Sequence, residues 1–211
     1  MDRCCSYSAQ SDVFDEKFAR RVARRYRRRG LDATARRLFE FLRGRGDTVL
    51  EIGGGVGELE LELLRAGATR ATNVELSRAY EHEGAKLLAD AGLSDRIEWR
   101  YGDIAVDRDL VETADVVVMH RVVCCYPDMP SLVGAAAEKT RRALGLSFPR
   151  NTWFVRIGGR FVNAWCRVRR SDFRFYVHRP EEIVRVARTH GLLLADTHTG
   201  RFWQVAAFAR E

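Results

Sequence analysis

The sequence is poor in several residue types on which whole classes of protein depend. Its 211 residues include four prolines, three lysines and five cysteines. The cysteines form two adjacent pairs, Cys4-Cys5 and Cys124-Cys125, and a single Cys166, with no Cys-x-x-Cys spacing. This pattern excludes a secreted disulfide framework and a zinc ribbon. We therefore expect reduced thiols and no bound metal.

Long hydrophobic runs are also missing. No stretch approaches the roughly 18 apolar residues that a membrane-spanning helix needs, and residues 1–5 lack the apolar core of a signal peptide. The hydrophobic fraction of 46% and the charged fraction of 31% are typical of a globular protein. We expect a cytoplasmic chain with one domain and an appendage.

The positive charge is concentrated near the amino terminus. The net charge of the chain is +7, and 33 of its 36 basic residues are arginine. Residues 17–45 alone carry twelve basic and two acidic residues, a net charge of +10. A basic segment of this kind is either a solvated surface or a site for an anionic partner such as RNA.

The same segment has the periodicity of two amphipathic helices. Apolar residues recur every four positions from about Asp12, and Gly30 ends the first helix. Asp32 is suited to begin the second. We expect residues 1–46 to form a helical lid whose aromatic side chains either pack as a core stripe or close over a ligand. The three candidates are Phe14, Phe18 and Tyr26.

The stretch from Val49 to Glu58 predicts a strand, a tight turn and the start of a helix. An apolar run ends at an acidic residue, and four glycines follow within five positions. Glycines in such a turn allow a positive φ and the close approach of a ligand. A dinucleotide-binding turn would need Gly-x-Gly-x-x-Gly, but Glu58 and Glu60 stand where the last glycine would be.

What is present, Glu51-x-Gly53-x-Gly55-x-Gly57, resembles motif I of the class I S-adenosylmethionine-dependent methyltransferases. The resemblance implies that these four residues surround the methionyl part of S-adenosylmethionine. A purely structural glycine turn is the alternative.

Two more acidic residues follow at the intervals that this family uses. Glu75 ends the second expected strand, 18 residues after Gly57, where a carboxylate accepts hydrogen bonds from a ribose diol. Asp103 follows the third strand, and the resemblance implies that it accepts from the adenine amino group with Ile104 against the ring. The alternative for Asp103 is a helix cap.

The remainder of the chain completes an α/β fold. Residues 114–119 are an almost uninterrupted apolar run, typical of a strand buried on both faces. Residues 144–149 predict a fifth strand, residues 151–170 a helix forming a second wall, and residues 192–209 an antiparallel hairpin. We expect residues 47–211 to form a Rossmann-like, seven-stranded, mostly parallel sheet that ends in this hairpin.

Methyl transfer from a sulfonium releases a neutral thioether, so holding the acceptor in line and excluding water can suffice. A general base helps only if the acceptor must lose a proton. His120 and His178 are the candidates. His120 could instead contact the edge of the cofactor, and His178 could cap the helix that begins at Pro180.

A small-molecule acceptor is our leading expectation. The residues Ser147-Phe148-Pro149, Thr152-Trp153 and Tyr176-Val177-His178 are weakly similar to magnesium-protoporphyrin O-methyltransferases, which favours a carboxyl or hydroxyl of a sizeable aromatic molecule. One alternative is an RNA or protein methyltransferase that uses the basic helices. Others are a metalloid methyltransferase assisted by the paired cysteines Cys4, Cys5, Cys124 and Cys125, and a non-catalytic binding protein. The oligomeric state stays open.

Overall fold

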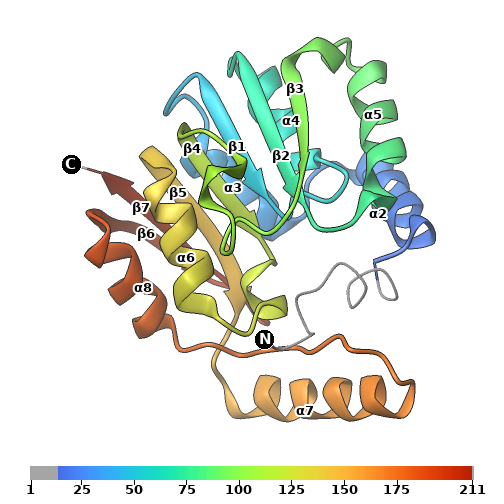
Figure 1. Ribbon diagram of the computed structural model, residues 1–211, viewed down its shortest axis with the longest axis vertical. Helices are drawn as coiled ribbons and strands as arrows, with labels where there is room; N and C mark the ends of the chain where they lie inside the picture. The colour runs from blue at the N-terminus through green and yellow to red at the C-terminus, as the bar shows by residue number, and fades with distance from the viewer. Residues whose placement is uncertain (1–13, 211) are drawn as a thin grey trace.

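A computed structural model describes residues 14–210 of the chain, and these residues build around one twisted sheet (Figure 1). The sheet has seven strands in the order β3-β2-β1-β4-β5-β7-β6. The first five strands pair in parallel, whereas β7 runs antiparallel to both β5 and β6. This confirms the expected sheet and its terminal hairpin. The strands are β1 (Thr48–Ile52), β2 (Arg70–Glu75), β3 (Ile97–Tyr101), β4 (Ala114–His120), β5 (Thr140–Pro149), β6 (Leu192–Thr199) and β7 (Trp203–Arg210).

Helices cover both faces of the sheet and bury two apolar cores. One core contains residues of the helices between the amino terminus and β3, and the other contains residues of α6 and α8. Strand β4 serves both cores, because Val116 and Val118 point to one and Val117 and Met119 to the other. The helices are α2 (Glu16–Arg29), α3 (Ala33–Leu42), α4 (Glu58–Arg65), α5 (Glu81–Asp90), α6 (Met129–Glu138), α7 (Trp153–Val168) and α8 (Pro180–Thr189).

The two basic amino-terminal helices pack on this sheet. The Asp32 side chain accepts hydrogen bonds from the backbone N–H groups of Thr34 and Ala35, which confirms it as the start of α3. Leu38 and Leu42 of α3 lie directly over Gly145 of β5, where an added Cβ would come within 2.9 and 3.0 Å of their side chains. Helix α3 therefore sits closer to the sheet than a larger residue at this position would allow. The start of the expected first helix, near Asp12, lies outside the described residues.

One strand is longer than the sequence predicts. Strand β5 begins at Thr140, four residues before the expected start at Leu144. The guanidinium groups of Arg141 and Arg142 lie beside the Asp115 carboxylate, at 3.1 and 3.6 Å. These ion pairs tie the start of β5 to β4.

Helix α7 is set apart from the layers that cover the sheet. It lies beyond the carboxyl ends of the strands and returns to α8 through an extended segment, residues 171–179 (Figure 1). The Asn163 side chain accepts from the Phe175 backbone N–H at 2.7 Å and donates to the Phe175 carbonyl at 2.9 Å. The helix expected over residues 151–170 is thus present and bonded to the returning chain. None of the described helices is both long and apolar enough to span a membrane.

Candidate active site

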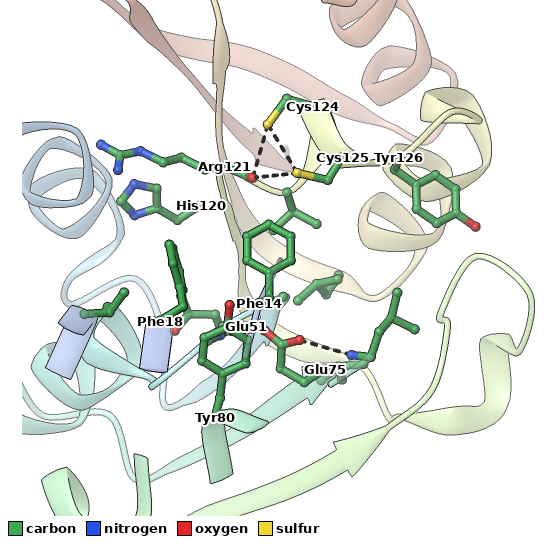
Figure 2. Close-up of a pocket in the computed structure, with 18 of the residues that line it drawn as sticks. Phe14, Phe18, Glu51, Glu75, Tyr80, His120, Arg121, Cys124, Cys125 and Tyr126 are labelled. Carbon is green, nitrogen blue, oxygen red and sulfur yellow. Dashed lines mark hydrogen bonds between the residues drawn. The ribbon is translucent and has the colours of Figure 1, made fainter. Parts of the chain in front are cut away.

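A cavity of about 490 Å³ opens at the carboxyl ends of the parallel strands. Ile52, Glu75 and His120, the last residues of β1, β2 and β4, all line it. This edge is where open α/β sheets bind their ligands. The volume suits a small-molecule or cofactor site. Figure 2 shows side chains from several of these elements converging on the cavity.

The glycine turn after β1 brings bare backbone to the cavity wall. Gly53 and Gly55 have φ values of +66° and +60°, conformations that L side chains rarely adopt. An added Cβ on Gly53 would lie 2.6 Å from the Val122 side chain. Gly54 lines the cavity as well. The turn therefore fits a ligand that approaches closer than side chains would permit.

Gly57 lies at the rear of the same turn. It begins α4 with φ +74°, and an added Cβ would lie 2.2 Å from Glu60 Oε1. It is not among the residues that line the cavity. The first turn of α4 and the buried Glu60 carboxyl thus require a glycine at this position.

Glu75 is held rigidly at the end of β2. Its Oε1 accepts from the Gly55 backbone N–H at 2.7 Å and its Oε2 from the Leu76 N–H at 3.1 Å. Burial raises the pKa of Glu75 to about 7, against the opposing effect of these hydrogen bonds. A carboxylate has about four acceptor sites, so Glu75 retains capacity for hydroxyl groups of a ligand.

Glu51 lines the cavity and also supports the turn. Its Oε2 accepts from the Glu60 backbone N–H at 3.0 Å, across the first turn of α4. Burial and the neighbouring Glu60 carboxyl raise the pKa of Glu51 well above its usual value. Glu51 therefore fixes the start of α4 relative to β1.

Asp103 and Ile104 lie together at the cavity after β3. Asp103 Oδ1 accepts from the Ala105 N–H at 2.9 Å, and Oδ2 accepts from the Tyr126 hydroxyl at 2.8 Å. Ile104 is buried in the core that contains residues of α6 and α8. Asp103 lines the cavity as expected, and its contact with Ala105 closes a turn and caps no helix, because the next short helix has Asp107 as its cap. Tyr126 is a cavity residue that the sequence did not reveal, because no spacing rule links it to Asp103.

Aromatic side chains from distant parts of the chain also line the cavity. Phe14 packs edge-on against both Phe18 and Phe173, with ring centroids 5.5 and 5.6 Å apart. Tyr26, the third aromatic candidate, is buried in the core beside α4 and bonded to Glu62 instead. The aromatic residues lining the cavity are Phe14, Phe18, Tyr80, Tyr126, Phe173, Phe175 and Trp203.

A charged cluster borders the glycine turn. Arg121 Nη2 lies 2.8 Å from Asp32 Oδ2, and Arg25 bridges Asp32 and Glu58 at 3.3 and 3.7 Å. Arg121 has φ +63° and its guanidinium lies 4.7 Å from the centre of the Trp203 ring. Sequence reasoning missed Arg25 because it is one of many arginines in its helix. Only the place of Arg121, directly after β4, could have drawn attention to it.

The two candidate histidines differ in position. His120 lines the cavity, and burial together with Arg121 lowers its pKa to about 4. Within residues 14–210 its buried Nε2 makes no hydrogen bond and lies 3.9 Å from Asp32 Oδ2. His178 lies outside the cavity lining, with Nε2 3.0 Å from the Tyr126 carbonyl oxygen. It does not cap α8, because Arg179 occupies that position without a side-chain hydrogen bond.

Two thiols line the cavity side by side. The Sγ atoms of Cys124 and Cys125 lie 3.7 Å apart and 3.3 and 3.9 Å from the Arg121 carbonyl oxygen (Figure 2). Cys166 is buried in α7. Cys4 and Cys5 lie outside the described residues, so the structure does not place them against this pair.

Comparison with known proteins identifies the fold and the family. A family model described as "Methyltransferase domain" matches residues 22–195, most of the chain. A comparison with curated proteins finds no match. Magnesium protoporphyrin IX methyltransferase from Synechocystis PCC 6803, solved with bound S-adenosylhomocysteine, is 20% identical with a TM-score of 0.64, over 94% of this chain and 84% of that one.

Two larger enzymes are also similar in structure. An O-methyltransferase family protein from Burkholderia thailandensis is 17% identical with a TM-score of 0.71, over 92% of this chain and 58% of that one. Mitomycin 7-O-methyltransferase is 18% identical with a TM-score of 0.68, over 98% of this chain and 61% of that one. At these identities the likeness shows the fold, and the family match carries the assignment. The chain belongs to the methyltransferase domain family and is a class I S-adenosylmethionine-dependent methyltransferase.

Proposed function

We propose that this methyltransferase acts on a small aromatic molecule that bears an oxygen, nitrogen or sulfur nucleophile. The aromatic side chains that line the cavity are the observation that carries this proposal. Phe173, Phe175 and Trp203 face the same cavity as the glycine turn and Glu75. Aromatic walls favour flat apolar ligands through offset and edge-on ring contacts.

The cavity also has the features that S-adenosylmethionine requires. We assign Glu75 to the ribose hydroxyls, and Asp103 with Ile104 to the adenine. Gly53, Gly55 and the neighbouring Glu51 would border the methionyl part, with Gly57 supporting the turn from behind. When bound, the cofactor supplies a methyl group on a positively charged sulfur.

The chain's own residues orient the acceptor and exclude water. His120 is neutral at pH 7, because its pKa is about 4. Its Nε2, which makes no hydrogen bond within residues 14–210, is suited to accept one from an acceptor O–H. A carboxylic acid is already ionised at pH 7 and needs no base, so a phenol is the acceptor class on which His120 would act. We assign to His178 a positioning role, because it contacts the backbone of the loop that carries Tyr126.

The test combines cofactor binding with a panel of acceptors. Titration with S-adenosylhomocysteine should show binding, and labelled methyl transfer should favour a phenol or aromatic carboxylic acid over RNA. Trp203→Ala should raise the acceptor KM while leaving cofactor affinity unchanged. Efficient labelling of RNA, falling steeply with salt, would instead support the basic helices as an RNA-binding surface and contradict our proposal.

The two histidines can be separated by substitution. His120→Ala should lower kcat about a hundredfold or more, the usual contribution of a general base, with cofactor affinity retained. His178→Ala should act mainly through the acceptor KM, because the Tyr126 loop loses a hydrogen bond. Unchanged turnover in both variants would exclude an acid-base role for either residue.

A thiol-binding acceptor is the second candidate, favoured by the adjacent Sγ atoms of Cys124 and Cys125 in the cavity. Soft thiolate ligands suit a trivalent metalloid. Arsenite methylation that disappears in a Cys124→Ser, Cys125→Ser variant would support this candidate. Retained phenol methylation in the same variant would support the aromatic acceptor.

A further inference from the structure

The outward face of α7 exposes large apolar side chains to solvent. Trp153 is 75% exposed, Phe161 72% and Trp165 63%. The buried residues of the helix, Val155 and Cys166 among them, lie on the opposite face. The exposed stripe comprises Trp153, Phe154, Ile157, Phe161, Trp165 and Val168. Contiguous apolar surface of this kind marks a binding site.

Arginines border this stripe and no acidic residue accompanies them. At 100° per residue, Arg156, Arg160 and Arg167 fall on one flank of the stripe, within about an eighth of a turn of one another. Arg169 and Arg170 follow at the carboxyl end of the helix. Residues 139–171 contain no aspartate or glutamate. The helix therefore presents an apolar face with cations alone beside it.

Within the described residues, one of these cations makes a side-chain contact: the Arg169 guanidinium lies 5.7 Å from the centre of the Trp165 ring on α7. In the part of the chain that the structure describes, no carboxylate lies within ion-pair distance of the arginines at positions 156, 160, 167, 169 and 170. All five are exposed. Their charge is available to an external anionic partner.

We propose that α7 binds the surface of an anionic lipid bilayer, lying in its plane with the apolar stripe among the acyl chains. An amphipathic helix with tryptophan and phenylalanine on one face and arginine beside them has the composition of interfacial helices. Anionic headgroups complement the arginines. At 16 residues the helix is too short to span the bilayer.

The charge argues against a second copy as the partner. A symmetric dimer would bring the same surface of both copies together. Each arginine row would then approach another arginine-rich helix with no carboxylate of α7 to neutralise it. A bilayer of anionic lipids would instead cover the apolar stripe and neutralise the arginines beside it.

The arrangement also places the active-site mouth near the bilayer. Phe175, which Asn163 of α7 holds by two hydrogen bonds, lines the cavity. The membrane proposal rests on α7 alone and does not depend on which acceptor the enzyme methylates.

Vesicle co-sedimentation of the full chain tests the proposal. Vesicles of phosphatidylcholine alone should bind weakly, and vesicles with about a third phosphatidylglycerol should bind strongly, since each arginine near such a surface adds roughly a fivefold gain. Phe161→Asp with Trp165→Asp should lower partitioning at least about tenfold. Arg156→Ser with Arg160→Ser should lower it on anionic vesicles only.

Matched controls come from other surfaces. Leu193→Asp replaces a similarly apolar residue, 43% exposed on β6, and Arg36→Ser with Arg37→Ser removes two exposed arginines of α3. Both should bind vesicles like the unmodified chain. Retained S-adenosylhomocysteine binding shows that each variant is folded.

Three results would overturn the proposal. The first is no binding of the unmodified chain to either vesicle, and the second is an equal loss of binding in the controls and the α7 variants. The third result is a stable dimer that the double variant Phe161→Asp, Trp165→Asp dissociates. The last result, read by sedimentation equilibrium, would identify a second copy as the partner.

Discussion

At the scale of single residues, the site is built on buried carboxyl groups near the glycine turn. Glu51, Glu60 and Glu75 are all buried, and the pKa of each is raised by burial. The hydrogen bonds that they accept hold the turn, the start of α4 and the end of β2 in one arrangement. Each acid is therefore both a structural and a titrating group.

Glu75→Ala is expected to weaken S-adenosylhomocysteine binding by roughly ten- to a hundredfold. The carboxylate offers charge-assisted hydrogen bonds to hydroxyl groups, each worth about 1.5–3 kcal/mol. Isothermal titration calorimetry measures the affinity, with exposed Glu98→Ala on β3 as the control. Unchanged affinity for Glu75→Ala would place the ribose elsewhere.

Glu60 should make the protein less stable as the pH rises. Burial raises the pKa of Glu60 to about 8, above its ordinary 4.5. The folded state therefore holds more protons than the unfolded chain between these values, so the free energy of unfolding falls from about pH 4.5 to about pH 8. Urea unfolding at several pH values measures this slope.

The variant Glu60→Gln isolates this residue. The amide keeps the acceptor that Asn73 Nδ2 contacts at 2.9 Å and removes the charge. The slope of stability against pH should become shallower than in the unmodified chain, and Glu112→Gln, at an exposed position before β4, is the control. An equal slope in both variants would mean that Glu51 and Glu75 dominate the titration.

At the scale of elements, a polar cluster joins three strands at the edge opposite the cavity. Asp115 Oδ2 accepts from the Asp47 and Thr48 N–H groups at 2.9 and 3.1 Å, and Arg141 Nε contacts Oδ1 at 3.1 Å. These contacts connect the starts of β1, β4 and β5. The hydrogen bonds lower the pKa of Asp115.

Asp115→Ala should reduce the free energy of unfolding by about 3 kcal/mol, since backbone donors lose a charged acceptor. Because the pKa of Asp115 is lowered, its contribution is present above about pH 4 and lost as the pH falls through the folded value. Chemical unfolding at pH 7 and pH 3 measures both effects. An equal loss at both pH values would contradict an ionic role.

At the scale of the whole molecule, the amino-terminal helices share the core of the sheet. Ala19, Ala23 and Leu38 belong to the same apolar cluster as Val49 and Val116. The sequence predicts a boundary at residue 46 between a lid and a methyltransferase domain. Because residues on both sides of this boundary share one apolar core, we expect the two parts to fold as a unit.

A chain limited to residues 47–211 should fail to fold stably. Removing α3 exposes the face of β5 that Leu38 and Leu42 cover, an apolar surface that promotes aggregation. Circular dichroism and size-exclusion chromatography of the fragment measure the result. A monomeric fragment that unfolds cooperatively would establish two independent domains.

Much of the fold, and the residues that line the cavity at the strand ends, could be predicted because they follow local patterns. The glycine turn, Glu75 and Asp103 lie at strand ends that periodicity locates, and the structure places Glu75 and Asp103 at the cavity with Gly53 and Gly55. Contacts between distant segments have no local signature. The position of Tyr126 beside Asp103 and the pairing of Arg121 with Asp32 depend on how loops meet after the sheet forms.

The strand order determines when the sheet can be completed during synthesis. Strand β7, the last in the sequence, lies between β5 and β6 and pairs with both. During synthesis on a ribosome, β6 would therefore emerge before β7, the strand through which it joins the sheet. Until then β5 would have an unpaired edge and the cavity would lack Trp203. Completion of the sheet and of the cavity lining thus waits for β7 to emerge, and the incomplete sheet exposes an edge through which nascent chains can associate.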